Sequence, residues 1–506
     1  MTCLRESHPS VTLPGIGTIE HLKNPSITEI KKYFYKYYVP NNMAVCMSGD
    51  LDYTETIKLI DKYLGTWEEA PVEPVQFDPE PPITEPVVKE VYGPQAELLF
   101  MGFRLDGRNS RDYLLMQLAD MILNNAQAGL IDLNLAQKQL VLAAGSFPLP
   151  MKDYSLHVFQ GRPKNGQSLE EVKDLILGQI ELLKKGEFED WLIDAVIADF
   201  KQNEMRQLES NGARTNHMVT AFTNDIAWSD YVSELSQMEN ITKEEIVDFA
   251  NRIYQDNYAV VYKRNGEDPN KVRILKPQIT KVDVNRNNKS EFYKDIETVT
   301  PPKLTPVFVD YNADIDKGNM KLDIEVLSKV NTENELFTLN YLLDLGSNND
   351  PKLGVAIQYL EYLGTPELPA EDFKKELYKL GCSFSVNASS ERTSVTLSGL
   401  DENMGKAMDL FEKLLINPEP DQEALDMLIG RLLKARSDNM KDKQNILMRG
   451  LYSYAKYGEN SSFTNVLSNE ELKSLKAEEL VEIIKGITSL EHRILYYGPK
   501  ESDELV

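Results

Sequence analysis

The strongest constraint on this chain of 506 residues is that it repeats itself. Three times, apolar residues at helical spacing are followed by a short stretch rich in β-forming residues. The three copies are residues 26–50, 240–263 and 475–499. Ser26, Thr242 and Ser474 stand near the starts of the helical stretches, where we expect their hydroxyls to cap the helices. The repetition indicates several related units joined in one polypeptide.

A longer unit occurs twice, at 143–203 and 379–438, and each copy predicts two strands followed by two helices. The two copies align Gly145-Ser146-Phe147 with Cys382-Ser383-Phe384, and Leu156-His157-Val158 with Val395-Thr396-Leu397. Strand pairs followed by helix pairs are typical of domains in which helices cover one side of a sheet. The sequence therefore predicts an α+β fold of repeated domains, each an antiparallel sheet with helices packed on one face.

Two breaks divide the chain into three pieces. Residues 69–87 form an acidic stretch crowded with prolines, which cannot be a helix or a central strand and predicts an extended linker. Residues 266–302 are polar, end in two prolines, and predict a second, longer linker. The pieces that these linkers separate are residues 1–68, 88–265 and 303–506.

The first and third pieces are shorter than the repeat requires. After a strand predicted at Met43–Met47, the first piece continues into a helix predicted at Thr54–Leu64, and no opening half precedes the pair. The third piece stops at 501–506, where its closing helix is expected. We therefore expect the chain to be an internal fragment. Residues 1–68 should be its least stable region, because half of their domain is missing.

The composition excludes several classes of function. Lysine and arginine number 55 against 80 aspartate and glutamate residues, a formal charge of −25 that argues against nucleic-acid binding. No run of about 18 apolar residues is present to span a membrane, and the first residues lack the apolar core of a signal peptide. Cys3, Cys46 and Cys382 are too few and too widely spaced for a disulfide framework, so the compartment stays open.

Residues 358–362, Gln-Tyr-Leu-Glu-Tyr, keep the outline of a zinc-peptidase motif, H-x-x-E-H. In that motif two histidines one helical turn apart hold Zn²⁺, and the glutamate activates the metal-bound water. Gln358 and Tyr362 stand where the histidines would be, and only Glu361, in the position of the base, remains. We expect these three positions to bind no metal and to have no catalytic role.

No other group of residues predicts an active site. The five histidines include no pair one helical turn apart, and Glu6, Glu20-His21 and Glu491-His492 are not spaced as metal ligands. His157 lies in a strand pattern between apolar residues, so we expect it to be a core or edge residue. The sequence contains neither a G-x-S-x-G nucleophile motif nor a glycine-rich phosphate loop.

Several short motifs follow one another near the start of the chain. They are His8-Pro9, Gly15-Ile16-Gly17, Tyr38-Val39-Pro40-Asn41-Asn42-Met43 and Ser48-Gly49-Asp50. Their succession resembles the end of a catalytic domain in the pitrilysin/insulin-degrading-enzyme family of zinc metallopeptidases. With the repeats and the degenerate motif, the resemblance covers nearly the whole chain. It implies four related insulinase-like α+β domains, or two half-length subunits, that close like a clam shell around peptides.

The resemblance also implies an assignment for each piece. Residues 1–68 would be the C-terminal part of the first, catalytic-type domain, and residues 88–265 the second domain. Residues 303–506 would be a third, degenerate catalytic-type domain. In the family the zinc ligands lie upstream of the segment that resembles the first piece. Zn is therefore expected in the full-length enzyme and no cofactor in this chain, whose partners would be the missing terminal domains and, in the full-length form, peptide substrates.

On this basis the chain is expected to be part of a zinc-dependent endopeptidase that degrades peptides in a closed chamber. It would supply chamber wall and a pseudo-catalytic domain, and it would be inactive alone. The alternative is a non-catalytic partner or structural core subunit of the same family, and an unrelated peptide-binding module is a third hypothesis. The linker at 266–302 favours the first interpretation, because it joins two halves within one polypeptide.

Overall fold

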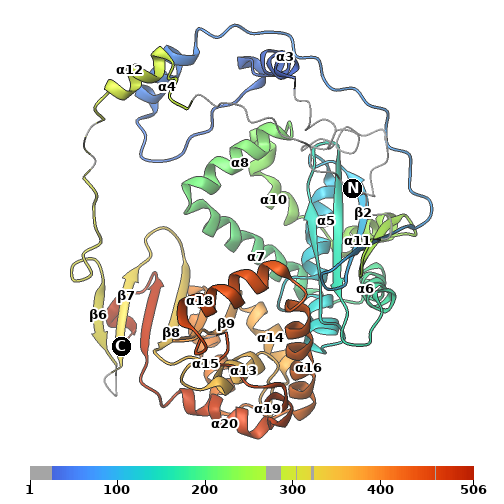
Figure 1. Ribbon diagram of the computed structural model, residues 1–506, viewed down its shortest axis with the longest axis vertical. Helices are drawn as coiled ribbons and strands as arrows, with labels where there is room; N and C mark the ends of the chain where they lie inside the picture. Colours follow the sequence, from blue (N-terminus) through green and yellow to red (C-terminus); the bar gives the residue numbers. More distant parts are fainter. Residues whose placement is uncertain are drawn as a thin grey trace.

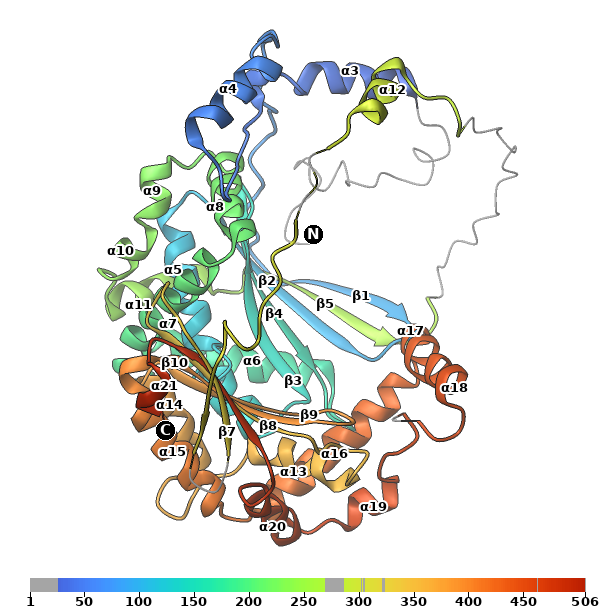
Figure 2. The ribbon, with the colours of Figure 1, turned by 90° about the vertical axis from the view of Figure 1, so that its left-hand side faces the viewer.

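The computed structural model describes residues 26–268 and 286–505, apart from 302, 304, 321–323 and 462. Two β-sheets with helices packed against them make up most of this part of the chain (Figure 1). The helices α3 and α4, together with α12, lie at one end of the molecule, away from both sheets (Figures 1 and 2). No helix in the described residues is long and apolar enough to cross a membrane.

The first sheet has five strands in the spatial order β1-β5-β2-β4-β3. They are β1 (Val87–Gly93), β2 (Leu98–Asp106), β3 (Ala143–Leu149), β4 (Tyr154–Arg162) and β5 (Tyr258–Asn265). The pair β1·β5 is parallel, and the other three pairs are antiparallel. The last strand of the unit therefore returns to the interior of the sheet, between the first two strands.

The second sheet repeats this arrangement. Its strands are β6 (Asp316–Asn319), β7 (Glu325–Val330), β8 (Leu336–Leu343), β9 (Cys382–Ala388), β10 (Thr393–Leu400) and β11 (Arg493–Gly498). Their spatial order is β6-β7-β11-β8-β10-β9, and β7·β11 is the parallel pair. Without the edge strand β6, the order and the directions are those of the first sheet. The predicted α+β class is confirmed, but each sheet is mixed, because its last strand returns through a helix and can then run parallel to the first.

The helices follow the order that the repeat predicts. In the first unit they are α5 (Arg111–Leu123), α6 (Leu169–Lys184), α7 (Trp191–Leu208), α8 (Asn211–Thr223), α9 (Trp228–Val232), α10 (Glu234–Met238) and α11 (Lys243–Ile253). In the second unit they are α13 (Pro351–Leu360), α14 (Ala370–Lys379), α15 (Met404–Ile416), α16 (Gln422–Asn439), α17 (Lys443–Asn445), α18 (Tyr452–Tyr457), α19 (Asn469–Ser474), α20 (Ala477–Ile487) and α21 (Ser502–Leu505). Thr242 caps α11 as predicted, whereas Ser474 ends α19 and Lys476 precedes α20.

Alternate strand residues face the helices in both units. Leu99, Met101 and Phe103 of β2 are buried in one core with residues of α5, α6 and α11. In the second unit Phe337 and Leu339 of β8 are buried with residues of α13, α15 and α20. Because side chains alternate between the two faces of a strand, the apolar set lies on one face, as the α+β prediction requires.

The strand pairing shows that the sequence alignment of the two copies was shifted by one residue. Phe103 of β2 lies opposite His157 of β4, and Tyr341 of β8 lies opposite Val395 of β10. His157 therefore corresponds to Val395, whereas the alignment matched Val395 with Leu156. A shift of one residue exchanges the two faces of a strand, and only the corrected alignment matches residues on the same face: Leu156 is buried against Ile83 on one face of its sheet, whereas Val395 is buried in the helix-covered core of the second unit.

Residues 26–68 are largely exposed. Helices α3 (Ile27–Tyr37) and α4 (Tyr53–Leu64) are capped by Ser26 and Asp52, but neither helix contains a buried residue. The strand predicted at Met43–Met47 is wrong, because these residues pair with no neighbouring strand among the described residues. Ser48 Oγ donates a hydrogen bond to Asn211 Oδ1 of α8 at 2.9 Å. The apolar residues of this region thus lack the packing that stabilises an amphipathic helix.

The two predicted linkers differ in how much of each is described. Residues 67–86 contain neither helix nor strand, as their prolines predict, and Ile83 is nevertheless buried against the first sheet. Pro81 accepts a hydrogen bond on its carbonyl oxygen from Arg104 at 2.6 Å. The second linker holds α12 (Glu291–Thr298), while its residues 269–285 lie outside the described part. The end of the first linker, at residues 81–83, is therefore held against the sheet.

The two sheet units pack against each other through α7 and α14. Tyr378 of α14 joins the hydrophobic core of the first unit, where its ring centroid lies 6.5 Å from that of Trp191 in α7. Gln139, which is fully buried, donates a hydrogen bond from Nε2 to the carbonyl oxygen of Ala424 in α16 at 2.9 Å. The junction between the units is therefore a packed interface, and the degenerate motif lies beside it.

Candidate functional site

The degenerate motif lies at the end of α13. Asp350 caps this helix by accepting a hydrogen bond from the Lys352 N–H at 2.8 Å, and Pro351 occupies its first turn. The helix ends at Leu360, so residues 361 and 362 lie beyond it. The Tyr362 N–H donates to the Tyr359 carbonyl at 2.9 Å, a spacing of three residues rather than four. The five motif positions are therefore not on one continuous helix.

The three predicted positions differ in their surroundings. Gln358 is exposed, and its side-chain Nε2 donates to the carbonyl oxygen of Gly354 in the same helix at 3.0 Å. Glu361 is exposed and follows the last helical residue. Tyr362 is half-buried, and burial raises the pKa of its phenol. At neutral pH the hydroxyl of Tyr362 therefore keeps its proton.

An arginine binds the side chain that replaces the second histidine. Arg431 of α16 donates a hydrogen bond from its guanidinium to the phenolic oxygen of Tyr362. The guanidinium carbon lies 5.7 Å from the centroid of the Tyr362 ring, within the range of a cation–π contact. The contact joins α16 to the end of α13 and places a permanent positive charge there.

Two more charged residues act on this region. Burial lowers the pKa of Lys374 on α14, while the charges of Glu361 and Asp132 act in the opposite direction. Asp132 belongs to the first unit, at the start of the π-helical turn Asp132–Gln137, and burial raises its pKa to about 6. The N–H of Asn125 donates to its carboxylate at 2.7 Å. The end of α13 therefore lies among two cations and two carboxylates at the junction of the units.

These residues do not fit a zinc ion. Zinc sites in proteins are built from imidazole, thiolate and carboxylate ligands. Here the ligand positions carry an amide and a protonated phenol, and the Arg431 guanidinium lies next to the phenol. In the part of the chain that the structure describes, no three His, Cys, Asp or Glu side chains lie close enough together to hold a metal. That Gln358, Glu361 and Tyr362 are without function stays a prediction.

Tyr359, inside the motif, has a structural role. Its side chain is fully buried, and its hydroxyl lies 2.7 Å from both the carbonyl oxygen and the backbone N–H of Asp421. The hydroxyl can donate to the first and accept from the second. Asp421 caps α16 by accepting from the Ala424 N–H at 2.9 Å. Tyr359 thus fixes the end of α13 to the start of α16, the helix that carries Arg431.

His157, expected to be a core or edge residue, is a core residue. His157 is fully buried, with Nδ1 2.7 Å from the hydroxyl of Tyr254 and Nε2 2.9 Å from Oδ1 of Asp120. Both ring nitrogens have partners, so the imidazole is positioned from two sides. The Nδ1 of His492 lies 2.8 Å from the carbonyl oxygen of Leu490, outside any metal cluster of the described residues. Glu6, His8, Glu20 and His21 lie outside the described residues.

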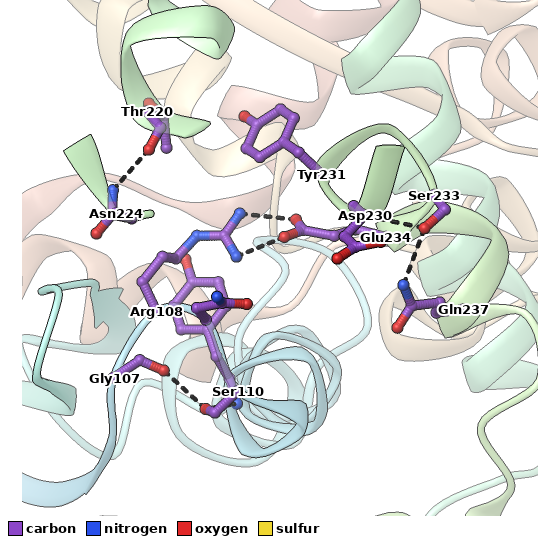
Figure 3. A network of polar contacts seen from close by, with 12 residues as sticks. Gly107, Arg108, Ser110, Thr220, Asn224, Asp230, Tyr231, Ser233, Glu234 and Gln237 are labelled. Carbon is purple, nitrogen blue, oxygen red and sulfur yellow. Dashed lines mark hydrogen bonds and ion pairs between the residues drawn. The ribbon is translucent and has the colours of Figure 1, made fainter. Parts of the chain in front are cut away.

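A second polar network lies in the first unit (Figure 3). Arg108, which is buried, donates two parallel hydrogen bonds to the carboxylate of Glu234, at 2.6 and 2.7 Å. Its guanidinium carbon also lies 4.3 Å from the centroid of the Tyr113 ring. Ser110 donates to the Gly107 carbonyl at 2.7 Å and caps α5. Because the arginine and the glutamate satisfy each other, this network holds α10 against the start of α5.

Comparison with known protein families accounts for both halves of the chain. Residues 26–200 match the family described as Peptidase M16 inactive domain, and residues 325–465 match Insulinase (Peptidase family M16). The chain belongs to the insulinase-like M16 peptidases. The first match runs through the proline-rich linker, and the second contains the degenerate motif at 358–362.

Individual M16 relatives are distant. The chain is 24% identical to the zinc protease PqqE of Helicobacter pylori over 262 residues, which are 50% of this chain and 57% of that protein. It is 21% identical to the mitochondrial-processing peptidase subunit beta of Neurospora crassa over 180 residues, 35% of this chain and 38% of that protein. The chain thus matches less than two thirds of either relative.

The fold agrees with this family assignment. The crystal structure of pitrilysin superposes on 99% of this chain and 56% of its own, with a TM-score of 0.52 and 14% identity. At this identity the likeness shows a shared M16 fold and nothing about activity.

The motif of this M16 chain is visible in its sequence, but the residues that surround the motif are not. Arg431, Lys374 and Asp132 belong to α16, α14 and a turn of the first unit. No spacing in the sequence connects these three with residues 358–362, because tertiary packing alone brings them together. A motif identifies residues that are near one another along one helix, and partners from other elements leave no such pattern.

Proposed function

We propose that this M16 chain is a non-catalytic part of a peptide-degrading assembly. It would form part of the wall of a closed chamber around peptide substrates, while a zinc site outside the described residues performs hydrolysis. The contact between Arg431 and Tyr362 carries the proposal, because it puts a guanidinium beside a ligand position of the motif. A cation there opposes the binding of Zn²⁺, and without the metal Glu361 has no activated water to deprotonate.

Two further observations support a non-catalytic role. The helix ends inside the motif, so two ligands placed at 358 and 362 would not have the spacing of one regular turn. The match of residues 26–200 to a family described as an inactive domain points in the same direction. Both observations support the proposal that the described residues contribute surface and support to the assembly rather than hydrolytic chemistry.

The experiment is an activity measurement on the purified chain. We would incubate it with a mixture of unstructured peptides, with and without added zinc, and detect cleavage by mass spectrometry. The proposal expects no cleavage in either condition. Cleavage that a chelator stops, and that Glu361→Gln abolishes while the exposed neighbour Glu367→Gln does not, would contradict it.

A second candidate is a non-catalytic partner or structural core subunit of the family. The similarity to a protein named as a subunit of a processing peptidase favours it. The two candidates differ in the size of the polypeptide that the source cells make. An immunoblot with antibodies against residues 88–265 would show a band well above 57.6 kDa if the chain is part of a longer peptidase. A band at 57.6 kDa would favour the separate subunit.

A further inference from the structure

A cavity opens between α15, α20 and the second sheet, on the side of the sheet that the helices cover. Its volume is about 270 Å³. Its walls are mainly apolar: Tyr341, Val395, Phe411, Leu415, Ile487 and Thr488. Val395, Phe411 and Ile487 are buried, and Tyr341 is partly buried. The cavity therefore reaches from the surface into the core of the unit.

The repeat shows what fills the corresponding place in the first unit. Phe103 pairs with His157 on one side and with Tyr258 on the other. Tyr341 pairs with Val395 and with Ile494 in the same way. The floor of the cavity thus corresponds to Phe103 and His157, with a valine in place of the imidazole.

The two units also differ at the residue that directly follows the helix leading into the last strand. In the first unit this residue is Tyr254, which follows α11, is 2% exposed, and has its ring centroid 5.0 Å from that of Phe103 and 5.7 Å from that of His157. In the second unit it is Thr488, which follows α20, is exposed, and donates from Oγ1 to the Lys485 carbonyl at 3.0 Å. The rings of Tyr254 and His157 thus have no counterpart at the corresponding positions of the second unit, although the imidazole of His492 also lines the cavity, with its ring centroid 6.2 Å from that of Tyr341.

The size and the polarity of the cavity indicate what kind of ligand it can hold. A cavity of about 150 Å³ with apolar walls is enough to bind benzene in a protein core. Drug-sized ligands need roughly 300–1,000 Å³, so about 270 Å³ suits one ring with a short substituent. The ring of Tyr254 in the first unit shows that this layer of the fold accommodates an aromatic group against the sheet.

The mouth of the cavity carries a negative charge. Glu412 of α15 is exposed there, and among the described residues no lysine or arginine forms an ion pair with its carboxylate. The imidazole of His492 also lines the cavity, with its Nδ1 2.8 Å from the carbonyl oxygen of Leu490. Burial raises the pKa of Tyr341 to about 12, and the charge of Glu412 adds to this increase. A ligand whose ring enters the cavity would therefore find a carboxylate near its substituent, which favours an ammonium group.

We infer that this cavity binds an aromatic ring that carries an amine on a short chain. Such a group is found in a free arylalkylamine and at the N-terminus of a peptide whose first residue is aromatic. The ring occupies the place that Tyr254 fills in the first unit, and the ammonium pairs with Glu412. This inference rests on the cavity and the repeat, and it is independent of the proposed function.

The test is a binding titration of the full chain, followed by NMR. The probes are 2-phenylethylamine, a short peptide amide that begins with phenylalanine, and 3-phenylpropionate as the acidic analogue. We expect the first two to bind with dissociation constants on the order of 1 mM or tighter, and the acid at least about tenfold more weakly. Binding of the peptide alone would identify a peptide N-terminus as the source, and binding of both would identify the amine class. Failure of both amines to bind, or equal binding of the acid, would overturn the inference.

Substitutions in the cavity test whether the ligand binds there. Thr488→Tyr restores the ring of the first unit and should reduce the affinity for 2-phenylethylamine at least about tenfold. Ile416→Trp, at a rim position that is 66% exposed, is a second filling variant in case the first unfolds the chain. Glu412→Gln should reduce the affinity about fivefold, whereas Asp409→Asn, on the same helix but outside the cavity, should not change it. Unchanged affinity in a folded filling variant would overturn the inference.

Discussion

Arg431 donates a hydrogen bond from its guanidinium to the phenolic oxygen of Tyr362, and this contact joins α16 to the end of α13. Tyr362 occupies the position of the second histidine in the degenerate motif. A guanidinium stays charged at any pH at which the protein is folded, so the positive charge at this position is permanent. The contact therefore explains why the end of α13 should not be regarded as a metal site that has merely lost its ion.

Replacing the two motif residues with histidines should not restore tight metal binding. In Gln358→His/Tyr362→His the second histidine lies beyond the end of α13, and Arg431 is left without its partner beside it. We expect the affinity for Zn²⁺, measured by titration calorimetry, to be at least about tenfold weaker than that of a histidine pair on a regular helix. Adding Arg431→Gln should recover part of this difference.

The matched control for the histidine pair is Glu244→His/Asp248→His. These two residues are exposed and lie four positions apart within α11, so their side chains share one helix face. If the pair at 358 and 362 binds zinc as tightly as this control while Arg431 is present, then neither the helix end nor the guanidinium opposes a metal. The interpretation of the site would then be wrong.

The raised pKa of Asp132 makes a testable contribution to pH-dependent stability. Burial raises this pKa from 3.8 to about 6, so the folded chain holds the proton more tightly than the unfolded chain does. The contribution of this group to stability is therefore complete below about pH 4 and is lost as the pH rises through about 6. Between these values the free energy of unfolding of the native chain should fall by up to about 3 kcal/mol relative to that of Asp132→Asn.

Chemical denaturation at several pH values measures this difference. Dilute protein is needed, because the range includes the isoelectric point of about 4.8. The informative quantity is how the difference in unfolding free energy between the two proteins varies with pH. The substitution also weakens the hydrogen bond from the Asn125 N–H, but this adds the same amount to the difference at every pH. A difference that stays constant from pH 4 to 7 would show that Asp132 ionises as a solvated carboxylate.

The buried network of His157 should contribute to stability through Tyr254. Tyr254→Phe removes the hydroxyl that lies 2.7 Å from Nδ1 and leaves a buried ring nitrogen without a partner. We expect a loss of about 1–3 kcal/mol in the free energy of unfolding, measured by denaturant titration. The matched control is Tyr341→Phe at the corresponding layer of the second sheet, which should cost less than about 0.5 kcal/mol. Equal losses in the two variants would exclude a special role for the hydroxyl of Tyr254.

The two cysteines in the described residues should differ in reactivity. Cys382 is 3% exposed, and burial raises the pKa of its thiol to about 11. Cys46 is partly exposed in a segment that belongs to neither sheet. Because the thiolate is the reactive form, Cys46 should be alkylated at least about tenfold faster than Cys382 at pH 8. Peptide mapping distinguishes the two sites from Cys3, and comparable rates at Cys46 and Cys382 would contradict the burial of the second.

Local patterns in the sequence predicted much of the fold. The helix caps at Ser26 and Thr242 are confirmed because a cap depends on residues within one turn. The order of strands and helices in each unit is confirmed for the same reason. The parallel pairs β1·β5 and β7·β11 were not predicted, because they join strands that are far apart in the sequence. Local propensity cannot decide which strand lies beside which.

The sequence-based predictions were wrong where contacts with another element of the fold determine the local structure. Residues 43–47 have the composition of a strand, but no strand among the described residues lies beside them, so they have no regular structure. The pattern of apolar residues in the strands at 154–162 and 393–400 is compatible with two alignments that differ by one residue. The strand pairing identifies the right one, because Phe103 lies opposite His157 and Tyr341 lies opposite Val395. The partners of the motif, such as Arg431, come from a third helix and follow from tertiary packing alone.

The most direct test of the central claim is the zinc content of the folded native chain. We would equilibrate the purified chain with a small molar excess of zinc, remove unbound metal by dialysis, and measure the metal by mass spectrometry beside a Glu361→Gln sample. The account predicts that neither sample retains zinc above the dialysis buffer, because Arg431 and Tyr362 occupy the position that a ligand would need. One zinc per chain in the native sample, lost in Glu361→Gln, would contradict it.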